Sequence, residues 1–231
     1  MNYPDLRSVP LHAIPEYPVV RSQSGRERRT EPASFHYARP QPGASYPDLV
    51  VLDTETTGLS STGDRIIELG AVRFQNGAPV ARFQSLVDPC MPIPYGATMV
   101  NGITDEMVAG APQISQILPS FEEFCGGAVI LGHNLGFDLS FLYYSGAELF
   151  GPGREYIDTL QLARRMLKTP AKILNPYTGK KEPDLLAPYD VLNYKLGTLC
   201  SYYGVSLHNA HRADADAYAT GLVFWQMLRE L

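Results

Sequence analysis

Residues 49–58 read LVVLDTETTG, an apolar run followed by two acidic residues that are two positions apart. The run 49–52 has the composition of a short buried strand. Side chains of a strand alternate between its two faces, so Asp53 and Glu55 project together from the strand end. Adjacent carboxylates repel each other unless a cation lies between them, and Mg²⁺ prefers carboxylate oxygens. The stretch therefore predicts a divalent metal site, with an acidic turn closed by Gly58 as the alternative.

The composition is that of one sizeable domain with short appendages. The chain has 231 residues, 45% of them hydrophobic, and a net charge of −5, which argues against a protein that coats nucleic acid through a wide basic face. Its three cysteines are far apart and lack zinc-type spacing, so we expect free thiols. No apolar run has the length of a membrane span, and the first residues lack a secretory signal. We therefore expect a cytoplasmic protein without a membrane partner.

Residues 1–45 differ from the rest of the chain. They hold seven prolines and six arginines against four acidic residues, without helical or strand periodicity. This composition predicts a mostly disordered tail that precedes a domain at residues 46–231. The alternative is a tail that docks on a partner or contacts phosphate.

From residue 48 onward the pattern is regular. Strand-like runs at residues 65–74 and 80–87 flank Asn76-Gly77, a strong hairpin signal. Further strands are predicted at 49–53, 128–131 and 156–157, and helices at 114–124, 137–150, 159–167, 195–203 and 213–231, with Thr104 as the cap of another helix. This order predicts an α/β fold with a mixed sheet flanked by helices and with ligands at the carboxyl ends of its strands.

A long loop is predicted to interrupt this order at residues 169–190. It contains four prolines and the pair Lys180-Lys181. Loops of this length inside a compact domain are uncommon and often functional. We expect a lid or flap in which Lys172, Lys180 and Lys181 meet phosphates, with a solvated loop as the alternative.

Two later segments carry acidic residues at helix starts. Residues 132–138, GHNLGFD, follow a predicted strand and place Asp138 near a helix N-terminus, which favours its anionic form. Residues 211–216, HRADAD, place His211 just before the last helix and Asp216 one turn inside it. Each segment taken alone also fits an ordinary helix cap or a surface acid.

Together, in this order, the three segments resemble the DEDDh 3′–5′ exonucleases, the group that contains the proofreading epsilon subunit of bacterial DNA polymerase III. Residues 66–70, 101–104 and 194–199 match as well, and the likeness covers about 48–231 without the 169–190 insertion. The tyrosine version of this superfamily would need a tyrosine where Arg212 stands, so the histidine version fits. The resemblance implies a ribonuclease-H-like mixed five-stranded sheet with helices on both sides.

The resemblance also implies two divalent metal ions, Mg²⁺ or Mn²⁺. Asp53, Glu55 and Asp216 would hold the ion on the nucleophile side, while Asp53 and Asp138 would hold the ion on the leaving-group side. Two such ions together stabilise the attacking and leaving oxygens of a phosphodiester. His211 would accept the proton of the attacking water, a role that suits an imidazole, whose ordinary pKa is about 6.5.

The 3′ end of the substrate would be held by residues beside these motifs. By resemblance, Leu59 and Met99 would contact the last bases, although both could equally be packing residues. Thr54, Thr56 and Asn101 are further expected to bind the substrate, the two threonines through their backbone amides.

Four neighbouring polar residues receive other expectations. Asp214 lies two positions from Asp216, so on a helix it faces elsewhere, at the surface or behind the site. Asp158 is expected to cap a helix, and Glu68 either supports the site or forms a structural pair. His133 is expected to be structural.

The expected function is metal-dependent 3′–5′ exonuclease action on DNA that releases nucleoside 5′-monophosphates. The substrate would be a single-stranded or frayed 3′ end, and the protein would act in proofreading beside a DNA polymerase, or in trimming with another replication or repair partner. An exoribonuclease of the same superfamily is the first alternative, since 2′-hydroxyl contacts would decide between DNA and RNA. A non-catalytic binding module is the second, although all five motif positions are filled.

Overall fold

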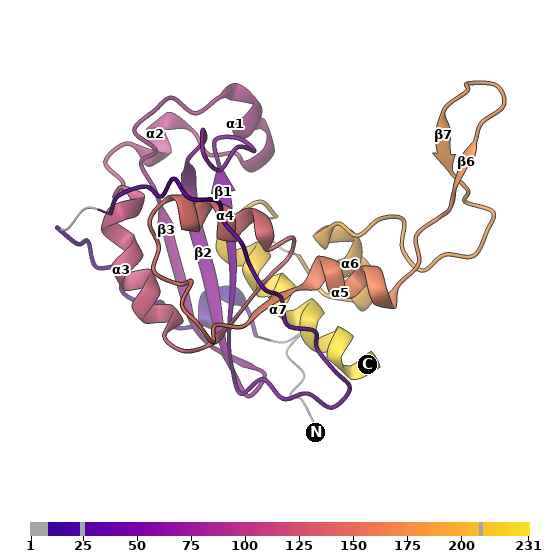
Figure 1. Cartoon of the computed structure of the whole chain (residues 1–231), viewed down its shortest axis with the longest axis horizontal. Helices are drawn as coiled ribbons and strands as arrows, with labels where there is room; N and C mark the ends of the chain where they lie inside the picture. The colour runs from indigo at the N-terminus through magenta and orange to yellow at the C-terminus, as the bar shows by residue number, and fades with distance from the viewer. Residues whose placement is uncertain (1–8, 24–25, 208–209) are drawn as a thin grey trace.

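A five-stranded mixed sheet forms the centre of the protein. The computed structural model describes residues 9–23, 26–207 and 210–231. The strand order is β3-β2-β1-β4-β5. The five strands are β1 (Asp48–Thr56), β2 (Ile66–Gln75), β3 (Ala78–Leu86), β4 (Val129–Gly132) and β5 (Tyr156–Asp158). Figure 1 shows them between helices, as the predicted α/β fold requires.

The pairing of the strands follows from their connections. β1, β2 and β3 run antiparallel, and the predicted turn between β2 and β3 forms at Asn76 and Gly77, both with positive φ. β4 and β5 pair parallel to β1. The carboxyl ends of β1, β4 and β5 therefore lie at the same edge of the sheet, where ligands of open α/β sheets collect.

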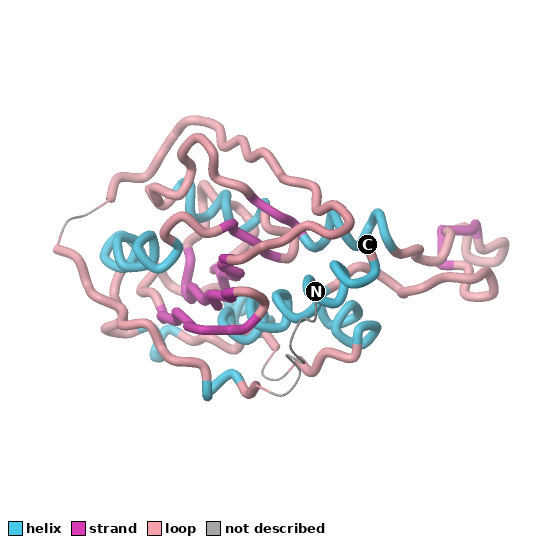
Figure 2. Tube along the Cα trace, turned by 90° about the horizontal axis from the view of Figure 1, so that it is seen from below, coloured by secondary structure: helices cyan, strands magenta, loops and turns pink. Residues whose placement is uncertain are grey.

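Helices cover both faces of the sheet, as Figure 2 shows in a second view. Leu49 and Val51 of β1 pack with α5 (Thr159–Met166), α6 (Leu196–Tyr203) and α7 (Ala213–Glu230). Val50 and Leu52 face the opposite way, toward α3 (Ile114–Cys125) and α4 (Gly136–Tyr144). The alternation along β1 thus determines which of the two helical layers each side chain of the strand faces.

A smaller hydrophobic cluster packs against strand β2. Ile67, Ile93, Ile103 and Val108 pack together there. The part of the chain that contributes Ile93, Ile103 and Val108 contains the short helices α1 (Tyr95–Asn101) and α2 (Asp105–Val108). Thr104 is the N-cap residue of α2, as predicted. Helix α1 was not predicted, because only one of its residues is buried and its sequence carries no apolar stripe.

Described residues of the segment predicted as a mostly disordered tail, 1–45, lie against the body of the domain. Ile14 beside the 3₁₀ helix η2 (Leu11–Ala13) is only 2% exposed and belongs to the core. The backbone of residues 15–17 pairs with Arg82 on edge strand β3, and Ala38 N donates to Tyr156 O on edge strand β5. The segment forms a strap that makes an isolated bridge to each edge strand of the sheet.

The helix predicted at residues 137–150 ends early. α4 stops at Tyr144, and Gly146 follows with a φ of 91°. A Cβ at Gly146 would lie 2.5 Å from the carbonyl oxygen of Glu27 in the strap, so only glycine fits this approach. The chain thus leaves α4 through a glycine that lies directly against the strap.

Residues 169–190 form an arm that projects from the body, visible at the right of Figure 1. The arm is less irregular than expected, because β6 (Lys172–Leu174) and β7 (Lys181–Pro183) pair as an antiparallel hairpin. Among the described residues, none of the helices has the length and apolar character to cross a lipid bilayer.

Candidate active site

The end of β1 delivers two carboxylates to the face covered by α7. Asp53 and Glu55 continue the alternation of Leu49 and Val51, whose side chains pack in the cluster that includes α7. A bulge in the pairing with β2 follows at Glu55 and Thr56 and ends the regular ladder. The predicted projection of Asp53 and Glu55 from a strand end is what the structure has.

Gly70 lets the start of α7 lie against this strand end. It stands opposite Asp53 in the β1–β2 ladder. A Cβ at Gly70 would lie 2.1 Å from the backbone nitrogen of Asp214 and 2.3 Å from the carbonyl carbon of Ala213. The backbone of α7 therefore contacts the sheet directly at this point, which brings Asp216 toward Asp53.

Two ion pairs fix the first turn of α7. Glu68, fully buried on β2, accepts hydrogen bonds from Arg212 Nη2 at 2.6 Å and from the Ala213 amide at 3.2 Å. Asp214 is buried and pairs with Arg82 Nη1 at 3.2 Å. Glu68 thus has the structural pairing foreseen as one of its two roles, and Asp214 lies behind the site instead of at the surface.

Asp138 reaches the same strand end from the opposite layer. It lies in the first turn of α4 and is 3% exposed. The ladder between β1 and β4 ends at Val51, so the backbone of Thr54 lies beyond it. Asp138 Oδ1 accepts from the Thr54 amide at 2.9 Å and from Thr54 Oγ1 at 2.7 Å.

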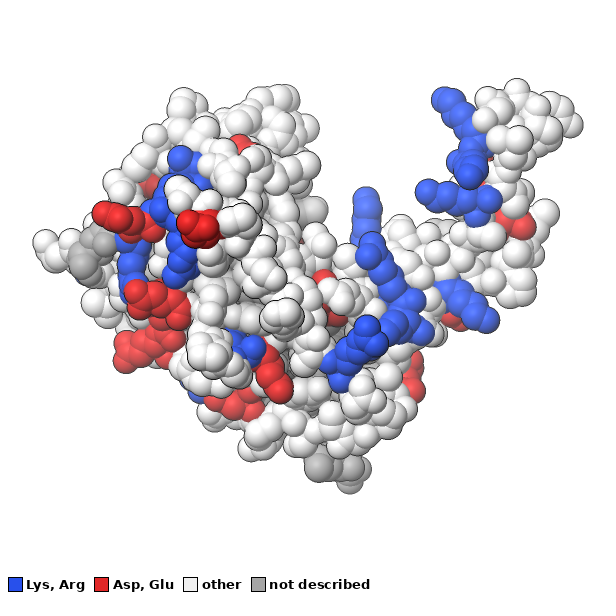
Figure 3. Space-filling view, in the orientation of Figure 1, with Lys and Arg blue, Asp and Glu red and all other residues white. Residues whose placement is uncertain are grey.

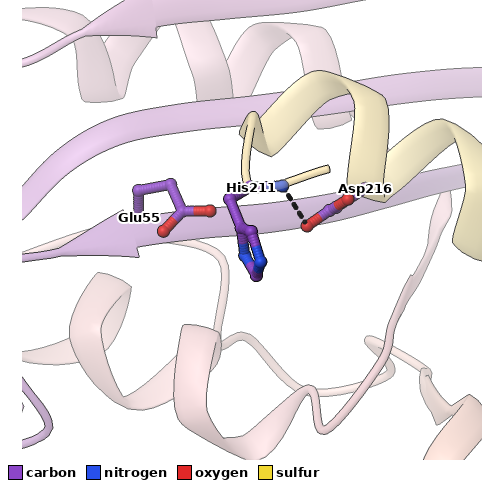
Figure 4. A group of neighbouring side chains, drawn as sticks. All are labelled: Glu55, His211 and Asp216. Atoms are coloured by element: carbon purple, nitrogen blue, oxygen red, sulfur yellow. Dashed lines mark hydrogen bonds between the residues drawn. The ribbon is translucent and has the colours of Figure 1, made fainter. Parts of the chain in front are cut away.

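The third motif completes the group around Glu55. Potential ligand atoms of Glu55, His211 and Asp216 all lie within 4.8 Å of one another. In Figure 4 the imidazole of His211 lies between the two carboxylates. The His211 amide donates to Asp216 Oδ2 at 3.2 Å, and a φ of 67° at His211 makes this turn.

Burial and like charge raise the pKa values of the two β1 carboxyl groups. Burial, followed by the charges of Asp138 and Asp216, holds the pKa of Asp53 well above its ordinary value. Burial, with the charge of Asp216 as the next cause, raises the pKa of Glu55 to about 8, against a hydrogen bond from Asn101. Burial and like charge thus disfavour the ionised form of both carboxyl groups.

The other two carboxyl groups behave alike. Burial raises the pKa of Asp138 to about 7, although the hydrogen bonds from Thr54 oppose the shift. Burial also raises the pKa of Asp216, against the amide and the charge of His211. The protein therefore concentrates four acids in one place without enough positive charge to offset them.

These residues fit divalent cations. The proposed donors are carboxylate oxygens, which suit Mg²⁺ or Mn²⁺. Asp216 Oδ1 is buried and has no hydrogen-bond partner among the described residues, whereas most buried polar atoms have one. A cation beside this oxygen would satisfy it and would favour the ionised form of all four acids.

The expected substrate contacts divide into two kinds. Leu59 and Met99 are 88% and 65% exposed, so the packing alternative does not hold for them. Thr54 and Thr56 are buried, and their hydroxyls donate to Asp138 and to the Gly58 carbonyl within the protein. The Thr54 amide also donates to Asp138, so both polar hydrogens of this residue are directed at that carboxylate.

Asn101 is buried like the two threonines, but it belongs to the same helix as Met99. It ends helix α1, it is buried, and its Oδ1 accepts from the Ile103 amide at 3.0 Å. Its side chain also reaches Glu55, where it lowers the pKa of that carboxyl group. It therefore ties α1 to the carboxylates.

Two remaining expectations concern the neighbouring strand ends. Asp158 caps α5 by accepting from the Leu160 amide, as predicted. His133 Nδ1 lies 2.9 Å from Thr159 Oγ1, which gives it the structural contact expected of it. The sequence signal that was missed is Gly70, whose role depends on a helix more than 140 positions later in the chain.

The fold agrees with the comparison to known proteins. Residues 50–224 match the exonuclease family RNase_T. The chain belongs to this family of nucleases, as the resemblance of its three motifs indicated.

Among the relatives of this chain are bacterial DNA polymerases. DNA polymerase III PolC-type of Caldanaerobacter subterraneus subsp. tengcongensis is 40% identical over 186 residues, which cover 80% of this chain and 12% of that protein. The PolC-type polymerase of Halalkalibacterium halodurans is 37% identical over 186 residues, 79% of this chain and 11% of that protein. The chain thus spans only a small fraction of the length of these relatives.

Solved structures with the same fold are exonucleases. "Exonuclease X in complex with 5′ overhanging duplex DNA" is 26% identical with a TM-score of 0.56, covering 79% of this chain and 92% of that one. E. coli exonuclease I in complex with a dT13 oligonucleotide is 20% identical with a TM-score of 0.58, covering 79% of this chain and 41% of that one. The second likeness concerns the fold alone, and together they confirm the ribonuclease-H-like sheet.

Proposed function

We propose that this protein removes nucleotides from the 3′ end of a DNA strand by divalent-metal-dependent hydrolysis and releases nucleoside 5′-monophosphates. The observation that carries the proposal is the meeting of three distant segments at one strand end. Glu55 from β1 lies within 4.8 Å of His211 and Asp216 at the start of α7, and Asp138 of α4 is held against the same strand. Membership of an exonuclease family supports the reaction type.

The roles proposed for the residues are those that the family resemblance implies. Asp53, Glu55 and Asp216 would hold one divalent ion, and Asp53 with Asp138 a second. Such ions supply Lewis-acid activation of water and stabilisation of developing charge on a phosphodiester. His211 is exposed and lies beside Glu55 and Asp216, where it can take the proton of an attacking water as the general base.

The 3′-terminal nucleotide would lie against the exposed apolar side chains next to the carboxylates. Leu59 follows the β1 motif, and Met99 projects from α1, whose last residue, Asn101, contacts Glu55. Exposed apolar side chains beside a nuclease site are suited to stacking against bases. Asn101 would keep this surface at a fixed distance from the reacting phosphate.

The choice of DNA and of a polymerase partner rests on the relatives. The PolC-type proteins are DNA polymerases, and one structural neighbour carries duplex DNA with a 5′ overhang. We therefore propose proofreading or trimming of a single-stranded or frayed DNA 3′ end in contact with a replication or repair protein. A cytoplasmic location is consistent with the three free thiols Cys90, Cys125 and Cys200.

End-labelled substrates test this proposal. Single-stranded DNA labelled at the 5′ end should shorten stepwise in Mg²⁺ or Mn²⁺, and 3′-labelled DNA should release labelled mononucleotide at once. EDTA should stop both reactions, and RNA of the same sequence should be degraded more slowly. Release of label from the 5′ end first, or equal rates with EDTA, would contradict the proposal, and faster RNA degradation would replace DNA by RNA as the substrate.

A further inference from the structure

The projecting arm, residues 169–190, stands in a part of the chain with an unusual charge. Residues 159–181 contain six of the 19 basic residues of the protein and none of its 24 acidic residues, although the whole chain has a net charge of −5. All six are exposed: Arg164, Arg165, Lys168, Lys172, Lys180 and Lys181. A local basic surface on an acidic protein is typical of contact with an anionic partner.

Acidic residues of the arm accept hydrogen bonds from the arm itself and from its base. Glu182 accepts from Asn175 Nδ2 at 2.7 Å and from Thr178 Oγ1 at 3.1 Å, so it braces the hairpin turn. Asp190 accepts from the Lys168 amide at 2.6 Å and closes the base of the arm. By contrast, none of the ion pairs in the described residues includes a lysine.

The hairpin separates these charges between its faces. Leu174 pairs with Lys181 and Lys172 with Pro183, so these four side chains share one face, while Ile173 and Glu182 occupy the other. Tyr177 at the turn is 96% exposed. One face therefore offers two ammonium groups and an apolar side chain, with an aromatic ring at the tip.

The basic side chains border a hollow. In Figure 3 the Lys and Arg side chains of the arm lie on its side nearer the body, and further ones line the surface below it. The arm points in the same direction as the carboxyl end of β1, where the candidate active site lies. The loop after the arm returns to that edge, because Tyr194 of this loop contacts His133 at the end of β4.

We propose that the arm and the surface around α5 bind the sugar–phosphate backbone of a single nucleic-acid strand whose 3′ end occupies the active site. This proposal rests on the proposed function for the direction of the strand. Lys172, Lys180 and Lys181 contact phosphates, and Tyr177 stacks on a base; contacts of this kind hold a strand without reading its sequence. The arm then favours strands long enough to span from the site to the hairpin.

Charge-removing and charge-keeping variants of the arm test the proposal. Lys172, Lys180 and Lys181 are replaced together by glutamine in one variant and by arginine in the other. Binding of fluorescent dT20 and dT4 is followed by anisotropy in EDTA at 50 to 200 mM salt, so that no hydrolysis is required. Hydrolysis of thymidine 5′-p-nitrophenyl phosphate in Mn²⁺ is measured separately.

We expect the glutamine variant to bind dT20 about tenfold more weakly, and the slope of log K against log salt to fall by about 2 for three lost phosphate contacts on a single strand. Binding of dT4 should be unchanged, and the arginine variant should bind dT20 like the wild type. A Tyr177→Ala variant should also lose affinity for dT20, by about fivefold or more, because base stacking contributes ~1–3 kcal/mol.

Several results would overturn the arm proposal. They are a glutamine variant that binds dT20 like the wild type, an arginine variant that loses as much affinity, or a wild type that binds dT20 no better than dT4. In the first case the arm would be better explained as a surface for a protein partner. Failure of the proposed function looks different, since the wild type would then bind dT20 through the arm and hydrolyse neither DNA nor the small phosphodiester.

Discussion

Thr54 donates two hydrogen bonds to one oxygen of Asp138, from its amide at 2.9 Å and from its hydroxyl at 2.7 Å. The contact joins two layers of the fold, because Thr54 lies on the central strand and Asp138 on helix α4. Both of these hydrogen bonds are to Oδ1 of the carboxylate. A residue expected to meet the substrate therefore sets the position of a carboxylate.

Replacing Thr54 by valine should slow hydrolysis while preserving the fold. Valine has the shape of threonine but lacks the hydroxyl, so Asp138 loses one of its two hydrogen bonds. A hydrogen bond to a charged group contributes about 1.5–3 kcal/mol, which corresponds to roughly 10- to 100-fold in rate if Asp138 is displaced. Thr54→Ser is the control, because it keeps the hydroxyl, and single-turnover rates should fall for valine and stay within about threefold for serine.

Gly70→Ala should destabilise the protein and displace the start of α7. The added Cβ would meet the backbone of Ala213 and Asp214, which cannot move without shifting the helix. We expect a loss of about 2–3 kcal/mol in the free energy of unfolding, measured by urea denaturation. The control is Gly197→Ala in α6, where an added Cβ meets nothing within 4 Å and the helix gains about 0.5–1 kcal/mol. Equal effects of the two changes would contradict the role of Gly70.

Stability should depend on pH and on metal in a linked way. The pKa values of Asp53, Glu55, Asp138 and Asp216 are raised in the metal-free fold, to about 8 for Glu55 and about 7 for Asp138. The folded chain therefore holds protons that the unfolded chain has released, and its stability falls as the pH rises from about 5 to 8. In EDTA the Tm should decline over this range, and Glu55→Gln should make the decline shallower.

Divalent metal should reverse this trend. Mn²⁺ or Mg²⁺ binds the ionised carboxylates and releases their protons, so the rise in Tm caused by metal should be larger at pH 8 than at pH 5.5. A metal effect that is equal at both pH values, or absent, would show that these four acids do not bind the ion together.

His211→Ala should reduce the rate of hydrolysis by about 10²–10⁴-fold, the usual effect of losing a general base. The side chain is exposed, so the Tm should change little. His12→Ala is the matched control, because this histidine of the strap is also exposed, and it should leave the rate unchanged. A His211→Ala variant with the wild-type rate would exclude the proposed proton acceptor.

The sequence was most informative where a short-range rule applies. The period of two along residues 49–55 places Asp53 and Glu55 on one face without knowledge of any other segment. Asn76-Gly77 likewise predicts its hairpin from local backbone preference alone. These features required only the immediate neighbours of each residue.

Features that depend on distant contacts were not predictable in this way. The strap uses isolated anchors such as Ile14, Tyr17 and Phe35, with no period between them, so its proline-rich composition looked like disorder. The role of Gly70 requires α7 to be in place, and the partner of Thr54 lies 84 positions away. Sequence order identified the candidate ligands, whereas the residues that position them became evident only in the fold.

The measurement that tests the central claim most directly compares two aspartates near the same helix start. Asp53→Asn removes the carboxylate proposed to hold both ions, whereas Asp214→Asn changes a carboxylate that pairs with Arg82 behind the site. Single-turnover shortening of 5′-labelled single-stranded DNA in Mn²⁺ is measured for both, with circular dichroism to verify folding. We predict a loss of about a thousandfold or more for Asp53→Asn and less than about tenfold for Asp214→Asn. Wild-type shortening by Asp53→Asn, or equal losses in the two folded variants, would contradict the assignment of this active site.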